Sequence, residues 1–140
     1  MKKLFTILTA LTALLSLASA QAGEKPALDG YCPVCYIAAG KAAKGSAEFA
    51  STHDGKTYYF VSKEVKGMFD AEPAKWLPQY DGYCAYGISL GKKFESDPTV
   101  FSVVDGKVYL NKDSEIGKEF AKDKEGNIKK ADVKWAELSK

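Results

Sequence analysis

Two stretches of the chain place runs of strand-forming residues on either side of an Asp-Gly pair. Asp-Gly supplies the positive φ angles that a tight hairpin turn needs, and the flanking runs are rich in Tyr, Phe and Val. The pattern therefore predicts two antiparallel β-hairpins. Their runs and turns are, in chain order, 47–51, Asp54-Gly55, 57–62, 100–104, Asp105-Gly106 and 107–110.

Helical periodicity follows each predicted hairpin. Ser62 is a favourable N-cap for a helix over residues 63–71, in which Val65, Met68 and Phe69 share one face that we expect to pack in the core. Further along, residues 76–80 contain Pro78 and predict an irregular packed segment.

The second hairpin is followed by two predicted helices. Asp113 or Ser114 caps the first, which extends to about residue 122. Gly126 is expected to end this helical stretch, so that a last helix starts near Asn127. The order of hairpin, helix, linker, hairpin and two helices predicts a small α+β single domain with two antiparallel β-hairpins and about three helices.

A short sequence recurs inside the chain. Asp29-Gly30-Tyr31-Cys32 reappears 52 residues later as Asp81-Gly82-Tyr83-Cys84. Four residues are too few to establish a duplicated fold. They do predict that the cysteines sit in similar local settings.

The N-terminal residues are typical of an export signal. Lys2 and Lys3 precede an apolar run over 4–17, and Ala18-Ser19-Ala20 fits the small-x-small pattern of a signal-peptidase site. The run is shorter than the ~20 residues that span a bilayer, which disfavours a membrane anchor. We therefore predict a signal peptide at 1–20, a lead-in at 21–28 and a domain at 29–140. The mature protein is then periplasmic or secreted, with no stable membrane insertion.

Composition narrows the class of protein further. All 20 cationic residues are lysines, against 18 acidic residues, and removing residues 1–20 leaves 18 of each. A balanced chain without arginine is not expected to bind nucleic acid or an anionic membrane surface. With one histidine and no phosphate-binding loop or hydrolase motif, we expect a binding protein rather than an enzyme.

The three cysteines carry the candidate chemistry. Cys32-Pro33-Val34-Cys35 is a C-x-x-C motif, and Cys84 is the third cysteine. Thiolates are soft ligands, so all three together would form a trigonal Cu(I) site. Zinc prefers four ligands, and His53, the only histidine, is the one candidate to complete its site.

Two other interpretations of these cysteines remain open. A C-x-x-C pair can exchange disulfides, although no β-α-β pattern precedes this one as a thioredoxin-like fold would require. Alternatively, a single disulfide could serve only to stabilise the fold and leave one thiol over. The spacing does not decide which pair would form it.

The chain also resembles a known domain family. The blocks at 29–36, 58–62, 69–73, 82–87 and 103–111 are similar, in order and spacing, to the YHS domain and to exported stand-alone YHS-domain proteins of bacteria. The resemblance covers about residues 28–135. It implies soft-metal handling, notably of copper, with a metal transporter or a metalloprotein acceptor as the partner.

One departure from the family pattern affects the expected site. In the metal-binding type the hairpin ends in Y-Y-F-C-S-x-x-C, but Val61 and Val65 stand at those two cysteine positions here. Cys84 is the available substitute ligand. We therefore predict an exported Cu(I) buffer or carrier that binds through Cys32, Cys35 and Cys84.

Overall fold

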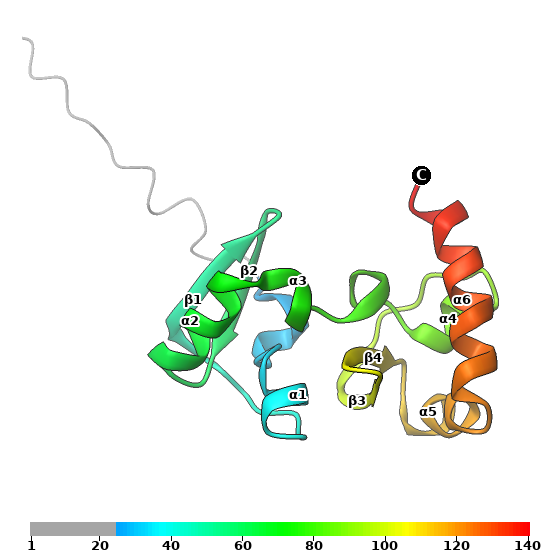
Figure 1. Ribbon diagram of the computed structural model, residues 1–140, viewed down its shortest axis with the longest axis horizontal. Helices are drawn as coiled ribbons and strands as arrows, with labels where there is room; N and C mark the ends of the chain where they lie inside the picture. Colours follow the sequence, from blue (N-terminus) through cyan, green and yellow to red (C-terminus); the bar gives the residue numbers. More distant parts are fainter. Residues whose placement is uncertain (1–24) are drawn as a thin grey trace, which may run out of the picture.

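The computed structural model describes residues 25–140 (Figure 1). The predicted signal peptide and positions 21–24 of the lead-in lie outside the described residues. Two separate two-stranded antiparallel sheets and several helices confirm the small α+β class. The elements are η2 (Ala27–Gly30), α1 (Cys35–Ala38), β1 (Ser46–His53), β2 (Lys56–Phe60), α2 (Lys63–Ala71), α3 (Pro73–Trp76), η3 (Gln79–Gly82), α4 (Ala85–Ser89), β3 (Asp97–Val104), β4 (Lys107–Asn111), α5 (Ser114–Ala121) and α6 (Lys124–Leu138).

This order of elements repeats once. A 3-10 turn, a short helix, a hairpin and two further helices occur first in residues 25–77, which we call the N-unit, and again in residues 78–140, the C-unit. The units lie side by side (Figure 1), and the chain passes from one to the other between α3 and η3. The chain is therefore built from two copies of one arrangement.

The two hairpins share one strand register. The pair Ser51 and Tyr58 recurs 51 positions later as Ser102 and Tyr109, and the register of each sheet shifts at the equivalent place. Asp29 and Asp81, in the repeated four-residue sequence, both adopt positive φ. The short sequence recurrence, too brief to establish duplication alone, thus marks a duplicated structural unit.

Each unit has its own core, built by equivalent aromatic residues. In the N-unit the rings of Tyr58 and Phe69 lie 5.4 Å apart, and in the C-unit those of Tyr109 and Phe120 lie 5.9 Å apart. Side chains alternate between the two faces of a strand. In β2 and in β4 the tyrosine lies on the face that packs against the helix following the hairpin. The hairpin and this helix are therefore the stable centre of each unit.

Side-chain caps fix where the longer helices begin. The Ser62 Oγ accepts from the Val65 amide, as predicted, and Asp113 caps α5 in the same way. The last helix starts earlier than predicted, because Asp123 accepts from the Gly126 amide. A Cβ at Gly126 would collide with the Asp123 carboxylate, so this glycine makes room for the cap and does not end a helix.

One further expectation is wrong. The Met68 side chain is 42% exposed, so only Phe69 and Val65 of the predicted apolar face pack inward. The segment 76–80 is irregular and packed, as expected: it joins α3 to η3, Trp76 and Tyr80 are buried, and Tyr80 has a φ of 59°. The short helices α1, α3 and α4 carry too few turns to give a periodic signal. Within residues 25–140, no helix has the length and apolar character needed to cross a membrane.

Tyr36 joins the two units. It is fully buried in a cluster with Val108 and Leu110 of the C-unit, and its ring lies 4.9 Å from that of Phe101. Its hydroxyl donates a 2.7 Å hydrogen bond to the carbonyl oxygen of Pro98. Burial raises the pKa of this phenol, which therefore stays neutral and keeps donating.

We expect Tyr36→Phe to lower the free energy of unfolding by about 1–3 kcal/mol, because the buried Pro98 carbonyl would lose its partner. Urea denaturation measures the change. Tyr59→Phe is the matched control, since the Tyr59 hydroxyl, half-buried, has no hydrogen bond to any described residue. Equal stability of the Tyr36→Phe protein and the wild type would contradict the role of this bond.

Candidate thiol site

Backbone pairing positions the C-x-x-C motif. The Cys32 amide donates to the Ala43 carbonyl at 2.8 Å, and the Gly45 amide donates to the Gly30 carbonyl at the same distance. These bonds close the chain between positions 30 and 45 into a loop. Within it, the Cys35 amide turns back to the Cys32 carbonyl at 3.3 Å, where α1 begins. The two cysteines are therefore held on one tight turn.

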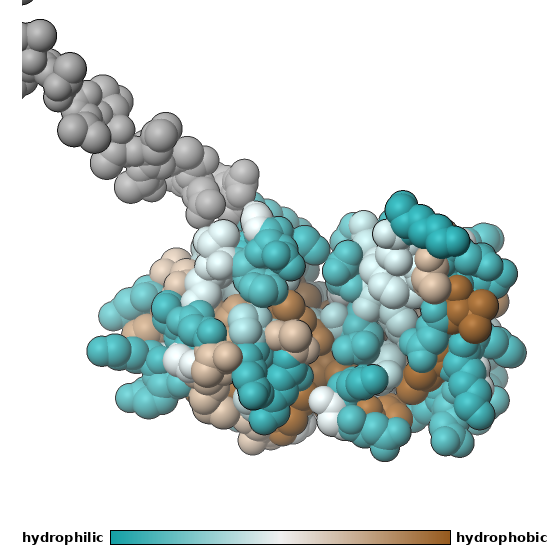
Figure 2. Space-filling model, turned by 45° about the horizontal axis from the view of Figure 1, so that its top comes forward, coloured by the Kyte–Doolittle hydropathy of each residue, from teal (hydrophilic) through white to brown (hydrophobic). Residues whose placement is uncertain are grey.

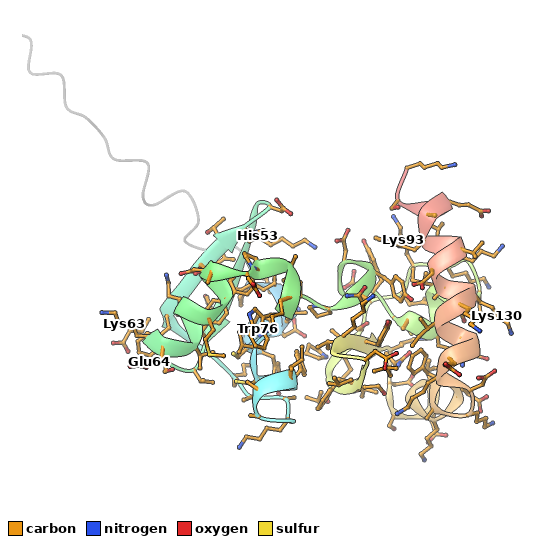
Figure 3. The ribbon with its side chains drawn as sticks, in the orientation of Figure 1. His53, Lys63, Glu64, Trp76, Lys93 and Lys130 are labelled. Carbon is orange, nitrogen blue, oxygen red and sulfur yellow. The ribbon has the colours of Figure 1, made fainter. Side chains whose placement is uncertain are left out.

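Both cysteines belong to the N-unit core. The Cys32 side chain is fully buried and that of Cys35 is 5% exposed. The thiols lie close together and are not bonded to each other. The neighbouring core is apolar and consists of Val34, Tyr58, Phe60, Phe69 and Trp76. Figure 3 shows Trp76 in the interior of this unit.

The surroundings keep Cys35 protonated. Burial, followed by the adjacent Cys32 thiol, raises the pKa of Cys35 to about 12. The positive charge of Lys41 acts in the opposite direction but is the weakest of these effects. The helix that begins at Cys35 has only four residues, so its dipole gives a thiolate little support. An unmetallated Cys35 is therefore a poor nucleophile at neutral pH.

Cys84 serves a different purpose in the C-unit. Its sulfur caps α4 by accepting from the Gly87 amide at 3.4 Å, and its thiol points to the Asn111 Oδ1 at 3.6 Å. The same Asn111 oxygen accepts from the Tyr86 amide at 3.0 Å. Cys84 and Asn111 are both buried, so this small polar network organises the start of α4.

The local setting of Cys84 matches that of Cys32, as the recurring sequence predicts. Each cysteine follows the repeated turn, and the Cys84 amide pairs with the Phe94 carbonyl at 2.9 Å. The position equivalent to Cys35, however, is Gly87. A Cβ there would lie 2.7 Å from the Phe94 ring, so the C-unit has no room for a second thiol.

The predicted four-residue ligand set is only partly brought together. Cys32 and Cys35 are neighbours, but among residues 25–140 no group of three or more Cys, His, Asp or Glu side chains is arranged to hold a metal ion. His53 lies at the hairpin end of β1 (Figure 3), with its ring edge on Phe69 and its Nε2 3.4 Å from Asp54. Cys84 and His53 thus do not complete a site around the C-x-x-C pair here.

The two valines at the family's cysteine positions have different surroundings. Val65 packs against the core cluster that holds Cys32 and Cys35, whereas Val61 is 41% exposed. The thiol pair therefore meets an apolar side chain where the family pattern would place a further ligand.

Asn111 is the residue that sequence reasoning missed. It ends β4 at the position that Phe60 occupies in β2. A polar residue at a strand position that is apolar in the other hairpin was the signal in the sequence for a special role. Its role depends on Cys84 and Tyr86, which are more than 20 residues away in the chain.

Comparisons with known proteins identify no relative of this chain. No family model, no curated protein and no solved structure matches the chain. The similarity to the YHS domain thus stays a prediction that rests on the sequence blocks, and the function has to be argued from the site itself.

Proposed function

We propose that the protein binds one Cu(I) ion between the thiolates of Cys32 and Cys35 and acts as an exported buffer or carrier of that metal. The observation that carries the proposal is a pair of adjacent thiols in an apolar enclosure. Thiolate sulfur selects soft ions, and two thiolate ligands are sufficient to bind Cu(I). Export follows from the predicted signal peptide at 1–20.

Cu(I) and zinc differ in the number of ligands that they require. Structural zinc takes four ligands in a tetrahedron. The described residues offer the thiol pair without a third or fourth metal-binding side chain beside it. We therefore expect zinc to bind far more weakly than Cu(I).

Lys41 partly offsets the charge of the loaded site. Two thiolates and one Cu(I) carry a net charge of minus one, which an apolar core disfavours. The positive charge of Lys41 acts on Cys35 and opposes this cost. Because the ion must displace the Cys35 proton, Cu(I) affinity is expected to rise with pH.

Thiol–disulfide exchange is the second candidate, since the same closeness of Cys32 and Cys35 permits a disulfide. Exchange needs an exposed thiolate of lowered pKa. Cys35 is buried and its pKa is raised. The geometry therefore favours the metal proposal over exchange chemistry.

A Cu(I) competition titration tests the proposal. In the presence of the chromophoric chelator bicinchoninate, we expect the reduced wild-type protein to withdraw one equivalent of Cu(I). Cys32→Ser and Cys35→Ser should each weaken binding by about 100-fold or more, because each removes one of two thiolates. Cys84→Ser is the matched control and should bind like the wild type, since the Cys84 thiol is engaged with Asn111.

Two results would overturn the proposal. Equal losses in all three serine variants would mean that Cys84 is also a ligand. Failure of the wild type to compete for Cu(I), together with an oxidised pair that equilibrates with a glutathione buffer, would assign Cys32 and Cys35 to disulfide exchange instead.

A further inference from the structure

A pocket of about 590 Å³ lies between the two units. Figure 2 shows a hollow between the two halves of the molecule on the face in view. Both copies of the repeated turn line the pocket, with Asp29 from the N-unit and Asp81 from the C-unit. Its volume is in the range of small-molecule sites, which are often found where two structural units meet. The duplication has therefore created a space that neither unit has alone.

The walls of this inter-unit pocket are partly apolar. Proline and leucine side chains from both units contribute, and Tyr58 adds an aromatic ring. Such a lining suits the hydrocarbon part of a ligand. The proline and leucine residues are Pro26, Leu28, Leu77, Pro78, Pro98 and Leu110.

The charges around the inter-unit pocket are unbalanced. Asp29 is neutralised by Lys25, at 2.8 Å. Asp81 and Glu95 also line the pocket, and within residues 25–140 neither carboxylate has an ion-pair or hydrogen-bond partner. Lys56 is the remaining cation of the lining, so the pocket carries one negative charge in excess.

Ser96 is a polar residue of the pocket lining. Its Oγ is buried and has no hydrogen-bond partner among the described residues, and the residue lines the inter-unit pocket beside Glu95. A buried hydroxyl without a partner costs about 1–3 kcal/mol.

The two acidic turns adopt the same unusual backbone conformation. Leu28 and Asp29 have φ angles of 57° and 52°, and Tyr80 and Asp81 repeat this with 59° and 53°. Positive φ in four non-glycine residues is costly, and such strain concentrates at functional sites. The turns that carry the pocket carboxylates thus share one strained conformation.

We propose that the inter-unit pocket binds a small organic cation, namely an amine or a guanidine on an apolar body. The cation pairs with Asp81 and Glu95, and the apolar body lies on the proline and leucine side chains. The binding does not involve the cysteines and is independent of the metal site.

Three matched probes of one shape test the charge preference. Phenethylamine is the cation, 2-phenylethanol the neutral analogue and phenylacetate the anion, each titrated into the purified ¹⁵N-labelled protein and followed by NMR. We expect phenethylamine to bind most tightly and to shift amide signals of the residues lining the pocket. Weaker binding of the cation than of either analogue would overturn the proposal, as would shifts confined to other surfaces.

Charge-removing variants locate the contacts. Asp81→Asn should weaken phenethylamine binding by about tenfold, the value of one charge-assisted hydrogen bond, and asparagine tolerates the positive φ at this position. Glu95→Gln should act in the same direction. Lys56→Gln removes a repulsive charge and should tighten phenethylamine binding. Glu137→Gln, on α6 and outside the lining, is the control and should change nothing.

The variants also separate the proposal from nonspecific attraction to negative charge. If Glu137→Gln weakens phenethylamine binding as much as Asp81→Asn, the effect is one of net charge and the proposal fails. If Lys56→Gln instead weakens the binding of phenylacetate and phenethylamine does not bind, the pocket takes anions and the proposal fails as well.

Discussion

Replacing Phe120 by alanine is expected to lower the free energy of unfolding by about 3–5 kcal/mol. The Phe120 side chain is fully buried in the C-unit core and packs on the Tyr109 ring. Truncation removes its burial energy and leaves a cavity that close-packed neighbours cannot fill. Because Phe69 has the equivalent place in the N-unit, Phe69→Ala should cost a similar amount. Guanidinium denaturation measures both.

Met68→Ala is the matched control for these two variants. Met68 precedes Phe69 in α2 but is largely exposed, so its truncation should change stability by less than about 0.5 kcal/mol. A loss for Phe120→Ala no larger than that of Met68→Ala would contradict the duplicated-core description.

The Cys35 thiol of the metal-free folded protein is expected to react with iodoacetamide about 1,000-fold more slowly at pH 8 than in the unfolded chain. Folding raises its pKa from 9.0 to about 12, so the thiolate fraction falls by the same factor. Quenched labelling with peptide mass spectrometry measures the rate for Cys35 alone. The urea-unfolded protein is the reference.

The direction of the change in labelling rate on folding distinguishes metal binding from disulfide exchange. A thiol activated for disulfide exchange labels faster in the folded state than in the unfolded state. Faster labelling of native Cys35 would therefore contradict the electrostatic description of the site and revive the exchange function.

Local signals allowed much of the fold to be predicted from the sequence. The Asp54-Gly55 and Asp105-Gly106 turns and the Ser62 and Asp113 caps all form where expected. In each case the structure is fixed by contacts within a few residues of the signal. The short helices lack such signals.

The duplication could not be established in the same way. Equivalent positions hold different residues, as with Phe60 and Asn111, and the likeness resides in backbone angles and strand register. The separation of Cys84 from the C-x-x-C pair follows from this arrangement. Each unit places one cysteine directly after its own repeated turn, so Cys32 and Cys84 lie in different units. Counting the possible metal ligands in the sequence does not reveal this separation.

The number of sulfur ligands around bound copper is the most direct test of the proposed Cys32–Cys35 copper site. Copper K-edge X-ray absorption on the Cu(I)-loaded protein reports that number, and Cys84→Ser provides the comparison. We predict a two-sulfur site with the same spectrum in the wild type and in Cys84→Ser. A three-sulfur site in the wild type that loses one sulfur in Cys84→Ser would contradict the assignment of the metal to Cys32 and Cys35 alone.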